Sequence, residues 1–416
     1  MNPVPAEAAK NIKGVAAKNK AFQVRGFLGA TVNAEIKKGA VRPDLGLIFS
    51  RVPAAVAGVF TRNLVKAAPL LLDQERIKEG RGQALLVNSG NANACTGKAG
   101  LKDARMLAGK VAEMLAIPAD SVFLASTGVI GQRLPAARMA RAIPELVKAL
   151  SPLKLSGLSE AIMTTDTFPK LLSGEIRFGK NKAALVAMAK GAGMIHPNMA
   201  TMLSFVLTDL AVSPALLQTF LHKAVDRSFN RISVDGDTST NDLVLVMANG
   251  LAGNRTIENS GDPGAREFSR TLDRLLLELA KMIIQDGEGA TKFITLEITG
   301  ARTKGEADLL AKTVATSPLV KTAFFGMDAN WGRILAALGR SGVFFDPDQV
   351  DLYFNRVQVV RKGLSAGLEK ERQAGKILKN RSLTVRIDLH QGQAKTLLYT
   401  CDLSLDYVRI NAHYRT

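Results

Sequence analysis

The sequence is poor in the residues that build metal sites, disulfide frameworks and membrane spans. Its 416 residues include four scattered histidines and two cysteines, Cys95 and Cys401. So few histidines argue against a histidine-built metal centre, and two cysteines are too few for a disulfide framework. No apolar run approaches the 18 or so residues that a membrane span requires, and the N-terminus lacks the apolar segment of a secretory signal. We therefore expect no metal, no membrane partner and a location in the reducing cytoplasm.

Aromatic residues are also scarce, at 5% of the chain with a single Trp. Proteins bind single-stranded nucleic acids largely by stacking bases on aromatic rings, so this scarcity argues against such a partner. The charge instead favours a nucleic-acid partner, because 55 basic residues against 37 acidic ones give a formal net charge of +18. A basic RNA-binding protein is therefore one alternative. However, the basic residues do not form blocks, and the same field attracts small dicarboxylates, so we expect no nucleic-acid partner.

The pattern of apolar residues predicts helices and strands interleaved along the whole chain. Short apolar runs predict buried strands at 84–88 and 122–126, and alternation predicts another at 293–299. The predicted helices are 102–116, 135–150, 214–229, 263–285, 304–316 and 330–339, and the last strands, expected to be antiparallel, are 352–360, 382–389 and 395–403. No regular βαβ period emerges, so the expected class is α/β (α+β) with mixed sheets.

The segment from Met188 to Leu207 carries the strongest chemical signal. Two glycines and a proline precede the pair Ala200–Thr201, which leads directly into an apolar run that predicts a strand. If the Ala200–Thr201 bond breaks by an N-to-O acyl shift, Thr201 gains a free α-amino group beside its hydroxyl. An α-amine has an ordinary pKa of about 7.7–8.0 and can serve as the base that activates this hydroxyl. The residues alone leave open that Thr201 is only a β-branched strand residue.

A series of collinear segments resembles the ornithine acetyltransferase family, the self-cleaving bifunctional glutamate N-acetyltransferases of arginine biosynthesis. The segment KGAGMIHPNMATML, residues 190–203, resembles the family's cleavage signature. The other segments follow in the family's order and are NSGNANACTG (88–97), STGVIG (126–131), MTTDTFPK (163–170), DGDTSTND (235–242), DGEGATK (286–292), DANWGRI (328–334) and NAHYRT (411–416). The resemblance extends over nearly the whole chain.

This resemblance implies cleavage between Ala200 and Thr201, giving an α chain of residues 1–200 and a β chain of residues 201–416. It implies a two-domain fold related to the β-peptidyl aminopeptidases, and two α and two β chains in a heterotetramer. The implied reaction is ping-pong transfer of acetyl from N-acetyl-L-ornithine to L-glutamate through acetyl-Thr201. No cofactor is expected, and acetyl-CoA is a further candidate donor. The alternative is an N-terminal-nucleophile amidohydrolase or aminopeptidase of the same fold, although such relatives typically present Ser at the cleavage point.

The resemblance also implies roles for individual residues. The hydroxyl of Thr127 and the backbone N–H of Gly128 are expected to stabilise the oxyanion, where one donor is typically worth about 2.7–4 kcal/mol. The expected substrate-binding residues are Thr164, Lys190, Thr201, Glu288, Asn411 and Thr416. A lysine suits a carboxylate, and a glutamate suits an ammonium group. Alternation leaves open which of Thr164, Thr165 and Thr167 contacts substrate, and the acidic residues Asp235, Asp237 and Asp242 are expected to be structural.

Overall fold

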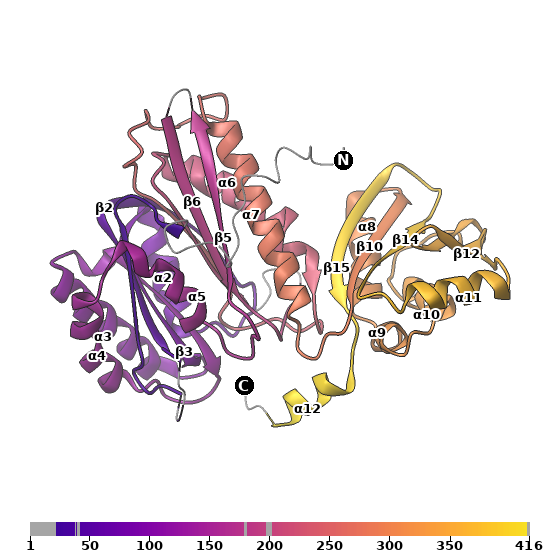
Figure 1. Cartoon of the computed structure of the whole chain (residues 1–416), viewed down its shortest axis with the longest axis horizontal. Helices are drawn as coiled ribbons and strands as arrows, with labels where there is room; N and C mark the ends of the chain where they lie inside the picture. The colour runs from indigo at the N-terminus through magenta and orange to yellow at the C-terminus, as the bar shows by residue number, and fades with distance from the viewer. Residues whose placement is uncertain (1–21, 38, 40–41, 179–180, 197–201, 414–416) are drawn as a thin grey trace.

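The computed structural model describes residues 22–37, 39, 42–178, 181–196 and 202–413, which form two lobes, each built on one sheet (Figure 1). The first sheet has the strand order β4-β3-β2-β9-β7-β6-β5, with β1 paired to β2. Its strands are β1 (Phe27–Val32), β2 (Leu45–Phe60), β3 (Arg81–Asn91), β4 (Val122–Val129), β5 (Lys170–Phe178), β6 (Asn181–Lys190), β7 (Leu203–Thr208) and β9 (Leu243–Ala248). Parallel and antiparallel pairs occur in the same sheet, which confirms the predicted fold class.

The second sheet forms the core of the C-terminal lobe and has the order β13-β12-β11-β14-β10-β15-β8. Its strands are β8 (Ile232–Ser233), β10 (Phe293–Ala301), β11 (Asp351–Phe354), β12 (Val357–Arg361), β13 (Leu364–Ser365), β14 (Ser382–Asp388) and β15 (Ala394–Cys401). The helices of this lobe are α8 (Lys304–Ala315), α9 (Pro318–Phe325), α10 (Trp331–Gly339) and α11 (Leu368–Ile377). Helix α12 (Leu405–His413) lies at the bottom of the view, between the two lobes (Figure 1).

Helices cover two parts of the first sheet. Helices α2 (Ala68–Arg76), α3 (Gly97–Leu115) and α4 (Ala136–Lys148) pack on the part formed by β1, β2, β3 and β4, and the short α5 (Leu158–Ala161) packs near β1 and β2. The part formed by β5, β6, β7 and β9 is covered by α6 (Pro214–Arg227) and the long α7 (Ala265–Gln285). Leu272, Leu276 and Ile283 of α7 are fully buried, as their helical spacing predicts. Helix α7 also contacts β15 and therefore joins the two lobes.

The sequence pattern predicted only part of these elements. It missed β1, β2, β5, β6 and β9 of the first sheet, and in the C-terminal lobe it was wrong about strand pairing. The predicted strand 352–360 is a hairpin of β11 and β12, which turns at Asn355 with a left-handed φ of +50°. The predicted strands 382–389 and 395–403 are not antiparallel neighbours. Instead, β14 and β15 lie on opposite sides of β10, with β14 parallel and β15 antiparallel to it. Helix α9 was not predicted. No described helix is long and apolar enough to span a bilayer.

The proposed cleavage point lies between two neighbouring strands of the first sheet. β6 ends at Lys190, which pairs with Leu203 at the start of β7 in an antiparallel ladder. β7 then pairs in parallel with β9, and β9 pairs with β2. The strands before and after residue 200 therefore belong to one sheet. Strands of the expected α chain pair with strands of the expected β chain at two places, β2 with β9 and β6 with β7.

Candidate active site

The end of β4 forms the first wall of the candidate site. Thr127 is buried there, and Gly128 adopts a left-handed φ of +131°. A Cβ atom on Gly128 would lie 2.3 Å from the carbonyl carbon of Gly90, so only glycine fits this close approach. The Asn241 amide donates hydrogen bonds to the carbonyl oxygens of Ala92 at 2.7 Å and Ser126 at 2.8 Å. These contacts fix the end of β4, where Thr127 and Gly128 lie.

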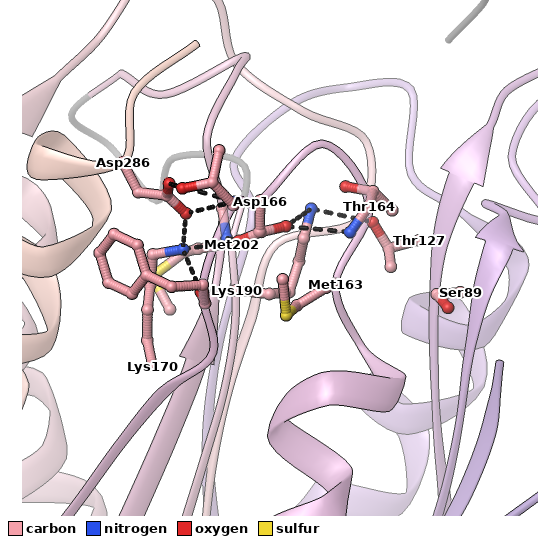
Figure 2. A network of polar contacts seen from close by, with 12 residues as sticks. Ser89, Thr127, Met163, Thr164, Asp166, Lys170, Lys190, Met202 and Asp286 are labelled. Carbon is pink, nitrogen blue, oxygen red and sulfur yellow. Dashed lines mark hydrogen bonds and ion pairs between the residues drawn. The ribbon is translucent and has the colours of Figure 1, made fainter. Parts of the chain in front are cut away.

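Lys190 enters this region from the end of β6. It is only 4% exposed, although an isolated lysine in a sequence is usually a surface residue. Its Nζ lies 3.4 Å from Thr127 Oγ1 and 3.9 Å from Asp166 Oδ2 (Figure 2). Burial lowers the pKa of Lys190, and the neighbouring Asp166 carboxylate opposes this shift. The structure therefore brings together Lys190 and Thr127, two of the residues predicted from the sequence.

The segment after α5 approaches the site as a turn and not as a strand, so alternation does not decide which threonine faces inward. Asp166 accepts hydrogen bonds from the backbone N–H of Thr164 at 3.0 Å and from that of Gly191 at 2.7 Å. The Thr167 hydroxyl and N–H instead donate to Asp286, away from Thr127. Asp166 Oδ2 accepts the Thr164 N–H and also lies 3.9 Å from Lys190 Nζ (Figure 2), and this link to Lys190 favours Thr164 over Thr167.

Four buried charges hold these parts in place. Lys170 is fully buried, and its Nζ lies 2.8 Å from Asp166 Oδ1 and 2.5 Å from Asp286 Oδ2 (Figure 2). Lys190 supplies the second cation, so two lysines face two aspartates. Burial alone would raise the pKa of Asp166, but Lys190 and Lys170 together lower it below its usual range. Sequence reasoning missed the roles of Lys170 and Asp286, which form an ion pair although they lie 116 residues apart along the chain.

Glu288 and Asn411, both predicted from the sequence, meet at a second part of the site. The Asn411 amide donates to Glu288 Oε2 at 2.8 Å, from an exposed position on α12. The backbone N–H of Glu288 donates to Ala192 O at 3.0 Å. A Cβ atom on Gly193 would lie 2.5 Å from the Glu288 carboxyl group. The glycine-rich segment after Lys190 therefore packs directly on this carboxylate.

Two aspartates anchor the chain on either side of residues 197–201. Asp235 accepts hydrogen bonds from the N–H groups of Met194 at 2.7 Å and Ile195 at 3.0 Å. The fully buried Asp242 accepts one from Met202 at 3.0 Å. Burial raises the pKa of Asp235 to about 6 and that of Asp242 well above its ordinary value. These contacts agree with the structural role that the sequence analysis gave to both residues.

Three predicted residues, Ala200, Thr201 and Thr416, lie outside the described residues. A separate hollow of about 600 Å³ lies at the opposite end of β5 and β6, where Arg25, Arg177 and Lys182 contribute to its lining. It contains none of the residues predicted for the site. The meeting of buried polar groups at the ends of β4 and β6 is therefore the stronger candidate for the chemistry.

Comparison with known proteins connects this geometry to a family. The model of the ArgJ family matches residues 29–416. The chain belongs to the ArgJ family. A relative from Geobacter sulfurreducens, named arginine biosynthesis bifunctional protein ArgJ, is 51% identical over 395 residues, which cover 95% of this chain and all of the relative. Membership makes the chain an acyltransferase of arginine biosynthesis, as its sequence predicted.

Two solved structures also resemble this ArgJ chain. An ornithine acetyltransferase from Mycobacterium tuberculosis, solved in complex with ornithine, is 39% identical with a TM-score of 0.41, over 45% of this chain and 98% of the other. A β-aminopeptidase from Burkholderia sp. is 13% identical with a TM-score of 0.39, over 68% of this chain and 92% of the other.

The buried charge network predicts an unequal response to two lysine substitutions. Lys170→Met leaves Asp166 and Asp286 without their shared cation, and breaking a buried ion pair costs about 3–5 kcal/mol. Lys182→Met removes an exposed pair with Glu175, in which the ions lie 3.1 Å apart, and such pairs contribute about 0–1 kcal/mol. Urea unfolding followed by circular dichroism, at one protein concentration, measures both. Equal losses would contradict the central role of Lys170.

Proposed function

We propose that this chain cuts itself between Ala200 and Thr201 and then transfers acetyl from N-acetyl-L-ornithine to L-glutamate through an ester on Thr201. The observation that carries the proposal is the meeting of Thr127 and Lys190 at the sheet end where the chain enters β7. The names of the two ArgJ-type relatives, a bifunctional protein of arginine biosynthesis and an ornithine acetyltransferase, support the same reaction.

Self-cleavage would begin with attack of the Thr201 hydroxyl oxygen on the Ala200 carbonyl carbon. The peptide C–N bond breaks, an ester forms, and the nitrogen becomes the free α-amine of Thr201. Water then hydrolyses the ester, which leaves a carboxylate on Ala200 and restores the Thr201 hydroxyl. The anchoring of Met194 by Asp235 and of Met202 by Asp242 supports this step, because it fixes the described chain before and after the cleavage point. The shared sheet ladders would keep the α chain and the β chain together.

In the first half-reaction, the Thr201 α-amine takes the hydroxyl proton while the oxygen attacks the acetyl carbonyl of N-acetyl-L-ornithine. The negative charge that develops on the carbonyl oxygen would be stabilised by the Thr127 hydroxyl and the Gly128 N–H. The acetyl C–N bond then breaks, the proton passes to the leaving nitrogen, and ornithine departs. In the second half-reaction, the neutral amine of L-glutamate attacks the acetyl ester, and Thr201 regains its hydroxyl. No coenzyme is consumed.

The remaining residues divide the binding of the two amino acids. We assign the shared α-carboxylate to Thr164 and to the Lys190 ammonium group, which lies beside the Thr127 hydroxyl. Glu288, with Asn411 on its Oε2, suits the side-chain ammonium group of ornithine. Thr416 and the Thr201 backbone would complete the contacts. Acetyl-CoA is a candidate second donor at the same hydroxyl, and we propose a cytoplasmic heterotetramer of two α and two β chains.

Denaturing electrophoresis with N-terminal sequencing tests the cleavage. The purified protein should give two bands, one of which begins Thr-Met-Leu-Ser. A Thr201→Ala variant should remain a single chain and lose acetyl exchange, because it lacks both the attacking oxygen and the new amine. Full exchange activity in that variant would refute the mechanism. Release of acetate without dependence on glutamate would instead favour the amidohydrolase alternative.

The oxyanion assignment predicts a specific loss in kcat. Thr127→Val removes one donor with little change in shape, and loss of one such donor typically lowers kcat by about 100- to 1,000-fold. Thr219→Val, on the exposed face of α6, is the matched control and should leave kcat unchanged. Steady-state kinetics with N-acetyl-L-ornithine and glutamate compares the two variants. A Thr127→Val enzyme with near-normal kcat would remove Thr127 from the oxyanion site.

A further inference from the structure

Lys37 is a third lysine at the candidate site, after Lys170 and Lys190, and no motif singled it out. It lies in the loop after β1, which the buried Asp44 carboxylate holds in place. Asp44 accepts hydrogen bonds from the backbone N–H groups of Ile36 at 2.6 Å and Lys37 at 3.0 Å, and from Ala34 at 2.7 Å. A loop anchored by three backbone contacts positions its side chains well, so the direction of Lys37 is set by the fold.

The Lys37 side chain contacts two parts of the site, the backbone before Thr164 and the glycine at the end of β3. Its Nζ donates to Met163 O at 2.6 Å, and this carbonyl belongs to the peptide bond that leads into Thr164. Its aliphatic stem packs on Gly90, where a Cβ atom would lie 2.5 Å from Lys37 Cγ. Gly90 in turn is the residue that Gly128 approaches. Gly90 therefore lies between Lys37 and the proposed oxyanion residues, Thr127 and Gly128.

These contacts close a ring around the site. Lys37 packs on Gly90, and Gly90 contacts Gly128 at the end of β4. The neighbouring Thr127 Oγ1 lies 3.4 Å from Lys190 Nζ. From Lys190 the ring continues through Asp166 to the backbone of Thr164, and the carbonyl before Thr164 returns it to Lys37. Two ammonium groups, those of Lys37 and Lys190, therefore belong to one ring of contacts with the predicted site residues.

Resting on the proposed reaction, we infer that Lys37 binds the side-chain carboxylate of L-glutamate in the second half-reaction. N-acetyl-L-ornithine brings one carboxylate and one ammonium group, whereas glutamate brings two carboxylates. Lys190 accounts for the carboxylate that both share, and Glu288 would repel the second one. The acceptor thus requires a further cation, and Lys37 supplies it. Among the described residues, Lys37 Nζ uses one of its three N–H donors, on Met163 O.

The charge state of Lys37 gives this role a pH dependence. Burial and the neighbouring Lys190 lower the pKa of Lys37 to about 8, with a smaller contribution from Arg42, while Asp44 and Asp166 act in the opposite direction. The ammonium form therefore predominates below pH 8 and is lost as the pH rises above it. Recognition of glutamate should weaken over the same range, whereas arginine at this position would stay charged.

Ping-pong kinetics separates the two half-reactions, because kcat/KM for each substrate reports its own step. Lys37→Met should lower kcat/KM for glutamate by about 10- to 100-fold and change that for N-acetyl-L-ornithine by less than about threefold. These values follow from the typical strength of a hydrogen bond to a charged group. Lys37→Arg should keep most of the glutamate activity. The ratio of wild-type to Lys37→Arg kcat/KM for glutamate should fall as the pH rises through 8.

The matched control is Arg42→Met, because Arg42 is exposed and also contacts Met163, with Nη1 at 4.0 Å from the sulfur. Its removal should affect both substrates little. An equal fall for both substrates in Lys37→Met would show a merely structural role and overturn the inference, as would an equal glutamate effect in Arg42→Met. If Lys37→Met still releases ornithine and uses glutamate normally, only this inference fails. A wild-type enzyme without exchange activity would refute the proposed function itself.

Discussion

The site depends on one buried carboxylate, that of Asp166. Its two oxygens receive the N–H groups of Thr164 and Gly191 and lie near the ammonium groups of Lys170 and Lys190. A buried ion loses several kcal/mol of hydration, and only well-placed partners offset this cost. The arrangement therefore favours a single geometry. It fixes the turn at Thr164 relative to Gly191 just after β6, and Lys170 links both to Asp286 after α7. The position of Lys190 beside Thr127 follows from this constraint.

Close backbone packing also fixes the positions of the site residues. A side chain at position 128 would collide with the backbone at Gly90, and one at position 193 would collide with Glu288. Such contacts let the ends of β3 and β4 approach each other, and the segment after β6 approach the Glu288 carboxylate, without intervening side chains, so that small shifts are resisted by direct collision. The same rigidity makes the proposed cut between β6 and β7 compatible with an intact site. Both strands lie inside the sheet and not at its edge, and their hydrogen bonds do not depend on chain continuity.

The sequence predicted what is local and periodic. Helices such as α7 and strands such as β10 follow from the spacing of apolar residues, and the family resemblance identified Thr127, Lys190, Glu288 and Asn411, which the fold does bring into two neighbouring groups. It failed where partners are distant. The pairing of Lys170 with Asp286 and the contact of Lys37 with Met163 join segments more than 100 residues apart, and no periodicity encodes them. The hairpin at Asn355 was missed because a two-residue turn interrupts an otherwise continuous apolar pattern.

The distribution of charge at the site separates groups that build it from groups that remain free for substrate. Lys170 lies between Asp166 and Asp286 and mainly fixes their geometry, whereas the neighbouring Lys190 is the cation that we assign to the shared α-carboxylate. Lys37 and Glu288 differ, because each has a neutral hydrogen-bond partner, a backbone carbonyl for Lys37 and an amide for Glu288. A charge held by a neutral partner keeps most of its attraction for an incoming ion. The proposed exchange brings a cationic tail in one step and an anionic tail in the next, and therefore requires one free charge of each sign; we assign these two roles to Glu288 and Lys37.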